Sequence, residues 1–73
     1  PSISRSGEFT LMTNSEIKIE KVEIFDANGK IVQSQILNED TVKANFVISG
    51  KSGNYYIRIV TNKGVTIKKV LKL

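Results

Sequence analysis

Alternating hydrophobic and polar residues recur in short runs along this chain of 73 residues. Residues 8–13, 42–48 and 55–60 each alternate with a period of two, which is typical of a β-strand with one buried face. No stretch keeps a helical period of 3.6 residues, so the pattern predicts a protein built of strands. The side chains expected to face inward from these runs are Phe9, Leu11, Thr13, Val42, Ala44, Phe46, Ile48, Tyr55, Ile57 and Ile59.

Two segments depart from simple alternation. Ile17 and Ile19 share one phase and Val22 and Ile24 share the other, which predicts a bulge or tight turn at residues 20–21. Residues 31–37 alternate poorly, which favours a strand covered on both faces.

The last predicted strand has an interrupted apolar face. Val65, Ile67, Leu71 and Leu73 share a phase that Lys69 interrupts. Either Lys69 extends its ammonium group to the rim of the core, or the strand shifts phase at residues 68–69.

Turn sequences separate the predicted strands. Asn28-Gly29 predicts a hairpin with a type I′ turn, because both residues tolerate positive φ. Residues 38–40 predict a polar turn, residues 49–53 a flexible loop, and residues 62–64 the last hairpin, with Gly64 at positive φ. Together these features predict one domain over residues 1–73, an all-β antiparallel sandwich of six to seven strands. Residues 1–7 have a linker-like composition and are expected to join it to missing upstream cargo.

Composition limits the chemistry available to the chain. Seventy-three residues form a small domain that buries only about 60% of its unfolded surface, so the core is thin. No apolar run approaches the roughly 20 residues of a membrane-spanning helix. The chain has no cysteine and no histidine, which excludes disulfides and thiolate metal sites. We predict no cofactor and no metal.

Positive charge is concentrated in the last third of the chain. Residues 1–50 carry five basic and seven acidic side chains, whereas residues 51–73 carry six basic and no acidic ones. A basic patch there would attract nucleic acid, anionic lipid or an acidic protein surface. Alternatively, its lysines protect an edge strand from aggregation.

Candidate catalytic and stacking groups are sparse. A nucleophilic triad lacks its usual histidine base. The acidic side chains are expected to be solvated, and these are Glu20, Glu23, Asp26, Glu39 and Asp40. Tyr55 and Tyr56 are neighbours on one strand and therefore face opposite sides, so at most one offers a surface for bases or sugars. We predict that the chain is not an enzyme.

Three sequence blocks carry a family resemblance. They are Pro1 with residues 7–11, residues 21–32, and residues 53–59 with Gly64 and residues 68–72. In this order they resemble the C-terminal sorting domain of cargo of the type IX (Por) secretion system of Bacteroidota. The matching positions are Pro1, Gly7, Phe9, Val22, Ile24, Asp26, Asn28, Gly29, Lys30, Val32, Gly53, Tyr55 and Gly64. The chain differs at Asn54, where the family usually has an aliphatic residue, and in the Leu73 that follows Lys72.

The resemblance implies an immunoglobulin-like sandwich that acts as an export signal. In the family, cargo reaches the periplasm through a separate N-terminal signal, and the outer-membrane translocon then recognises the sorting domain. A sortase-like surface protease commonly removes the domain, and the cargo becomes attached to the cell surface or is released. The implied partners are therefore the translocon, the protease and the upstream cargo domain, and no nucleic acid is expected.

The final strand is our candidate for recognition by the translocon. A partner can add a strand to an exposed edge, and lysines there would complement an acidic surface. The predicted recognition residues are Lys68, Lys69, Val70, Leu71, Lys72 and Leu73. Deleting residues 70–73 is expected to stop export and leave the fold largely intact, and the same edge is a possible dimer contact.

Two other functions remain open from the sequence. One is an adhesive or carbohydrate-binding sandwich of a secreted enzyme, which would need a surface row of aromatic residues. The other is a small nucleic-acid binder that uses the basic hairpin, which would bind with a steep salt dependence.

Overall fold

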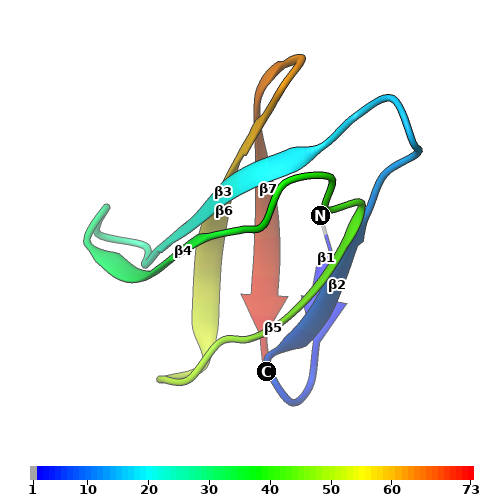
Figure 1. Ribbon diagram of the computed structural model, residues 1–73. Coiled ribbons are helices and arrows are strands. Elements are labelled where there is room, and N and C mark those ends of the chain that lie inside the picture. Colours follow the sequence, from blue (N-terminus) through cyan, green and yellow to red (C-terminus); the bar gives the residue numbers. More distant parts are fainter. Residues whose placement is uncertain (1) are drawn as a thin grey trace.

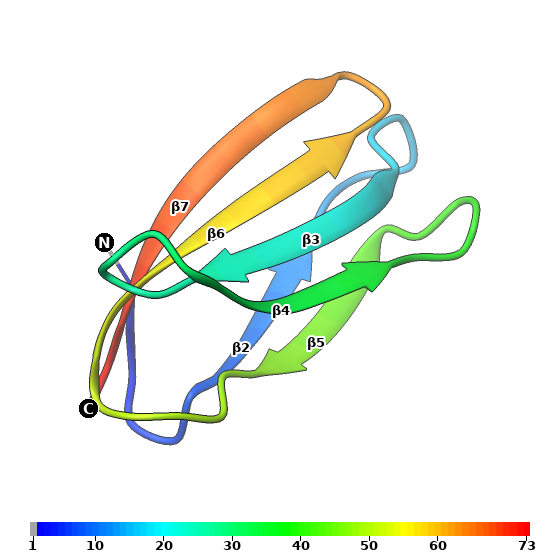
Figure 2. The same ribbon diagram turned by 90° about the vertical axis from the view of Figure 1, so that its left-hand side faces the viewer.

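Seven β-strands in two sheets form the computed structural model, which describes residues 2–73. The strands are β1 (Ser2–Ser4), β2 (Glu8–Met12), β3 (Ile19–Phe25), β4 (Ile31–Ile36), β5 (Lys43–Val47), β6 (Gly53–Thr61) and β7 (Gly64–Lys72). One sheet has the order β1-β7-β6-β3-β4, and the pair β2-β5 lies against it (Figures 1 and 2). This confirms the all-β sandwich of six to seven strands. Within residues 2–73 no helix is long and apolar enough to cross a membrane. Pro1, one of the matching family positions, lies outside the described residues.

One strand pair is parallel, which the antiparallel expectation did not include. Ser2 pairs with Val70 and Ser4 with Lys72, so β1 runs alongside the end of β7 in the same direction. The main-chain N–H of Leu73 continues this pairing by donating to the Ser4 carbonyl at 2.9 Å. Residues 2–4 are therefore part of the sheet, and their role as a junction to an upstream domain stays a prediction.

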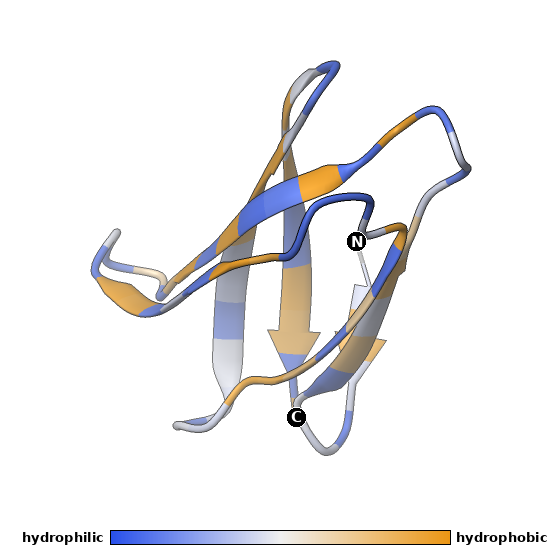
Figure 3. Cartoon of the chain, viewed as in Figure 1, coloured by the Kyte–Doolittle hydropathy of each residue, from blue (hydrophilic) through white to orange (hydrophobic). Residues whose placement is uncertain are grey.

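The core lies between the two sheets and follows the predicted alternation. Its buried members are Ile19, Val22, Ile24, Phe46, Ile48, Tyr55, Ile57, Ile59 and Val70. Apolar and polar residues alternate along β3 in Figure 3. Phe9 of β2 stacks on Phe46 of β5 with ring centroids 5.3 Å apart, and the Tyr55 hydroxyl donates to the Lys51 carbonyl at 2.7 Å. The predicted inward faces of β2, β5 and β6 are confirmed.

The predicted bulge in β3 is also confirmed. The register between β3 and β6 shifts between Ile19 and Lys21. A bulge adds one residue to one strand, so Ile19 and Val22 are both buried although their positions differ by an odd number.

The β3–β4 turn differs from the predicted type I′ turn. Gly29 has φ +83°, but Asn28 does not have a positive φ. The Asp26 carboxylate accepts hydrogen bonds from the main-chain N–H groups of Asn28 and Lys30, at 2.9 and 3.0 Å. This side chain stabilises a longer loop in which only the glycine needs positive φ, because aspartate readily bonds the backbone two residues ahead.

The prediction that residues 31–37 are covered on both faces is wrong. β4 is an edge strand, and Ile36 is 81% exposed. The inward positions opposite Val22 and Ile24 belong to Gln35 and Gln33. The two-stranded sheet is narrower than the five-stranded one, so the apolar residues Ile31, Val32 and Ile36 of this edge strand stay exposed.

Candidate recognition site on the last strand

The face that β7 presents to the core is opposite to the predicted one. β7 pairs with β6 without any register shift, from Gly53↔Lys72 to Thr61↔Gly64. Val70 is opposite buried Tyr55, and Lys68 is opposite buried Ile57, so these two residues face inward. Both predicted explanations of Lys69 are therefore wrong, because the strand neither shifts phase nor turns Val65, Ile67 and Leu71 inward.

The physical reason is the limited width of the second sheet. Thr66 and Lys68 occupy inward positions near the open side of the sandwich. No strand of the smaller sheet covers these two positions, so they do not require apolar side chains. The apolar residues of the first half of β7, Val65 and Ile67, lie on the outer face and are exposed.

The six predicted recognition residues differ in accessibility. Val70 is 4% exposed and belongs to the core. The Lys72 ammonium donates to the Gly50 carbonyl at 2.6 Å. Lys69 and Leu71 share the outer face of the sheet with Tyr56 and Asn54, and Leu73 is 48% exposed. A partner can therefore contact Lys68 from the inner side and Lys69, Leu71 and Leu73 from other directions.

The end of β7 is not a free edge. β1 pairs with residues 70–72, and β6 pairs with them on the other side. Strand addition at these residues would have to displace β1. Across the described part of the chain, the unpaired edge of β7 is confined to residues 64–69.

Basic residues of the last third do not form one patch. Lys63 lies in the β6–β7 turn, while Lys51 lies in the loop before β6, at the opposite end of the sheet. Lys68 and Lys69 point to opposite faces of β7. Arg58 is neutralised by Glu23, with Nη1 and Oε1 2.7 Å apart. This distribution contradicts the continuous basic patch and gives no support to a nucleic-acid surface.

Glu23 is the acidic group that the fold perturbs most clearly. It lies on the outer face of β3, where Arg58 donates a hydrogen bond to it and Lys21 lies 3.6 Å away. The hydrogen bond from Arg58 and the neighbouring positive charges hold the pKa of Glu23 below its ordinary value of 4.5, despite partial desolvation. Glu23 is thus ion-paired rather than solvated as predicted.

Glu23→Gln is expected to destabilise the fold at neutral pH and to have a progressively smaller effect in acid. Because the folded-state pKa is lowered, the contribution of Glu23 is complete above pH 4.5 and is lost as pH falls through the folded value. Urea unfolding of both proteins across this range measures the difference. A difference that stays constant with pH, or that persists unchanged in an Arg58→Gln background, would contradict the assignment to this ion pair.

Most of the matching family positions have structural roles. Val22, Ile24 and Tyr55 are core residues, and Gly7 is buried against the carbonyl of Ile48. Asp26 organises its turn, as described above. The positions that remain exposed are Asn28, Gly29, Lys30 and Val32, around the β3–β4 turn, and Gly64 at the start of β7.

The candidates for other chemistry are dispersed. Residues 2–73 contain no group of three or more acidic residues placed to hold a metal ion. Tyr56 is exposed and lies opposite Phe25, whereas Phe46 and Tyr55 are buried and Phe9 stacks on Phe46. These aromatic residues do not form the exposed row that a carbohydrate-binding surface needs.

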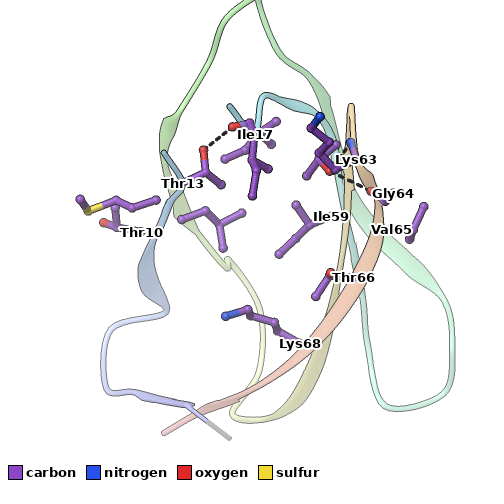
Figure 4. A pocket seen from close by; sticks show the side chains of 13 residues that line it. Thr10, Thr13, Ile17, Ile59, Lys63, Gly64, Val65, Thr66 and Lys68 are labelled. Atoms are coloured by element: carbon purple, nitrogen blue, oxygen red, sulfur yellow. Dashed lines mark hydrogen bonds between the residues drawn. The ribbon is translucent and has the colours of Figure 1, made fainter. Parts of the chain in front are cut away.

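A groove between β2 and β7 is the feature that the sequence analysis did not anticipate. Its volume is about 550 Å³, and Figure 4 shows its lining side chains. They are Thr10, Leu11, Met12, Thr13, Ile17, Ile19, Ile59, Thr61, Lys63, Gly64, Val65, Thr66 and Lys68. The groove depends on the polar residues Thr66 and Lys68 facing inward. The sequence alone does not reveal this, because it follows from the pairing of β7 with β6.

A family model described as "Secretion system C-terminal sorting domain" matches residues 5–72. No curated protein and no solved structure matches the chain. The matched range includes β2 to β7 and every turn between them.

Proposed function

Because the chain belongs to the family of secretion system C-terminal sorting domains, we propose that the type IX translocon recognises it and carries its upstream cargo across the outer membrane. A sorting signal of this kind directs export to the outer membrane, the cell surface or the medium. The finer steps that we propose are transit through the periplasm, recognition by the translocon and removal of the domain by a sortase-like surface protease.

The observation that carries this proposal is the match over residues 5–72. Two features of the fold support it. Most of the matching positions lie in turns or in the core, and several side chains of the last strand are accessible. No cluster of groups within residues 2–73 suggests a competing chemistry. A signal that only has to be recognised needs a stable scaffold and an exposed segment, and the fold supplies both.

We propose that recognition uses the accessible side chains of residues 68–73. Lys69 and Leu71 lie two residues apart on the outer face of β7 and belong to the segment that the family resemblance singles out. Val70 between them is buried and holds the strand in place. The role of Val70 is then to position its neighbours rather than to contact the translocon.

An export assay tests the proposal. Residues 1–73 are fused to the C-terminus of a periplasm-directed fluorescent protein and expressed in a host with a type IX translocon and in a translocon-deficient strain. We expect fluorescence at the surface or in the medium only in the intact strain. Retention of a folded fusion in the periplasm of both strains would contradict the proposed function.

Two double variants of the fusion separate recognition from folding. Lys69→Gln with Leu71→Thr changes the proposed recognition face and should abolish export. Lys43→Gln with Ile36→Thr makes the same chemical changes at exposed positions on β5 and β4 and should leave export unchanged. Equal export of both variants would exclude residues 69 and 71 from recognition.

A further inference from the structure

The groove lies between two strand edges. In the described chain, β2 pairs with β5 on one side, and residues 64–69 of β7 pair with β6 on one side. From these two strands the groove is lined by Thr10, Leu11 and Met12 of β2 and by Gly64, Val65, Thr66 and Lys68 of β7. An unpaired strand edge presents a row of backbone donors and acceptors that another strand can use.

β1 shows how a strand adds to the edge of β7 next to the start of β2. It pairs with residues 70–72 of β7, and the Ser4 hydroxyl donates to the carbonyl of Glu8, the first residue of β2, at 2.7 Å. β1 therefore occupies one end of the space between these strands. The groove lies along β7 beyond the end of β1, where Gly64, Val65, Thr66 and Lys68 line it (Figure 4).

The lining of the groove combines an apolar floor with positive charge. Leu11, Ile17, Ile19 and Ile59 supply apolar surface. Lys63 and Lys68 are the charged residues of the lining, and it contains no acidic side chain. Such a lining favours an occupant that carries apolar and acidic side chains together.

Lys68 is the most informative residue of the groove. It is at an inward position of β7, opposite Ile57, and its side chain is directed toward the β2 side in Figure 4. Among the described residues no carboxylate lies within ion-pair distance of its ammonium group. An inward lysine at an edge disfavours the addition of an apolar strand, but it can accept a strand that places a carboxylate beside it.

We propose that the groove is the docking site for an extended acidic segment of a partner protein. The segment adds to residues 64–69 of β7 through main-chain hydrogen bonds and extends the line of β1. Every second side chain then faces the groove, with an apolar one over Ile19 and Ile59 and a carboxylate beside Lys68. Its side-chain contacts do not include the outer-face residues Lys69 and Leu71. Lys68 belongs both to this site and to the segment proposed for sorting, but the groove does not depend on that function.

The proposal is tested with a peptide whose sequence reads the same in both directions, so that it presents the same side chains whether it binds parallel or antiparallel to β7. The peptide Thr-Glu-Thr-Val-Thr-Glu-Thr, blocked at both ends, presents two carboxylates and a valine on one face. Its partner Thr-Lys-Thr-Val-Thr-Lys-Thr differs only in the sign of the charge. We expect the purified chain at low salt to bind the acidic peptide at least roughly fivefold more tightly, as measured by the fluorescence anisotropy of peptides that carry the same N-terminal fluorophore.

Two charge-reversed variants supply the matched control. Lys68→Glu should invert the preference between the peptides. Lys69→Glu carries the same net charge but points to the outer face, so it should keep the preference of the unmodified chain. Equal inversion in both variants, or no preference in the unmodified chain, would overturn the proposal.

Hydrogen exchange locates the bound peptide. Added acidic peptide should protect main-chain N–H groups of residues 64–69 and leave those of the β4 edge unchanged. Protection at β4 instead would overturn the proposal. Protection of residues 64–69 that rises with protein concentration alone would also overturn it, because the occupant would then be a second copy of the chain.

Discussion

Replacing Gly7 with alanine is expected to lower the free energy of unfolding by roughly 3 kcal/mol. Gly7 is buried and has φ +87°, a region that disfavours any side chain. A Cβ at this position would overlap the carbonyl oxygen of Ile48 and approach Cε of Lys72 at 3.1 Å. The main chain cannot easily move away, because the Ile48 N–H donates to the Gly7 carbonyl at 2.9 Å.

Gly29→Ala is the matched control for this prediction. Gly29 has a similar φ of +83°, but a Cβ there would meet no atom within 4 Å. Its replacement is expected to cost only the backbone strain, about 1 kcal/mol. Urea unfolding of the two variants measures the difference, and equal destabilisation would show that packing against Ile48 has no effect.

Deletion of residues 70–73 is expected to unfold most of the domain. The deletion removes the buried Val70, whose burial is worth about 1.5 kcal/mol or more, and every β7 residue that pairs with β1. It also removes the hydrogen bonds that Lys72 and Leu73 donate to Gly50 and Ser4. A domain of this size has an unfolding free energy on the order of 5 kcal/mol, so these losses together are comparable with its whole stability. Circular dichroism and urea unfolding measure the outcome.

The sequence alone predicts that this truncation leaves the fold largely intact, whereas the contacts of Val70 and β1 predict the opposite. Loss of export by the truncated chain would therefore not identify a recognition segment. Deletion of Leu73 alone is the control, because it removes a half-exposed residue and one main-chain hydrogen bond and should leave a folded domain. A cooperatively folded truncation with unchanged stability would contradict the structural role of Val70 and β1.

Local sequence was sufficient for the strands whose inner face is covered. The alternation of β2, β5 and β6 predicted their inward residues, since side chains two apart on a strand share a face. The bulge in β3 was also predictable, because a phase change within an apolar run requires an inserted residue. The turn after Phe25 was predicted at the right place, but its type depended on the carboxylate of Asp26.

The errors occurred at the two sides of the sandwich, in β4 and β7. Alternation shows which side chains share a face, but it does not show which face another layer covers. Lys68 faces inward because the two-stranded sheet does not cover the full width of the larger one. Gln33 also faces inward, but its side-chain oxygen is buried without a hydrogen-bond partner, which no local pattern predicts. The parallel contact of β1 with β7 joins residues far apart in the chain, and no local pattern encodes such a contact. The strand content, the core residues of β2, β3, β5 and β6 and the family of this chain thus follow from its order of residues. The burial of Val70, the accessible faces, the dispersed lysines and the groove arise from the packing of distant segments.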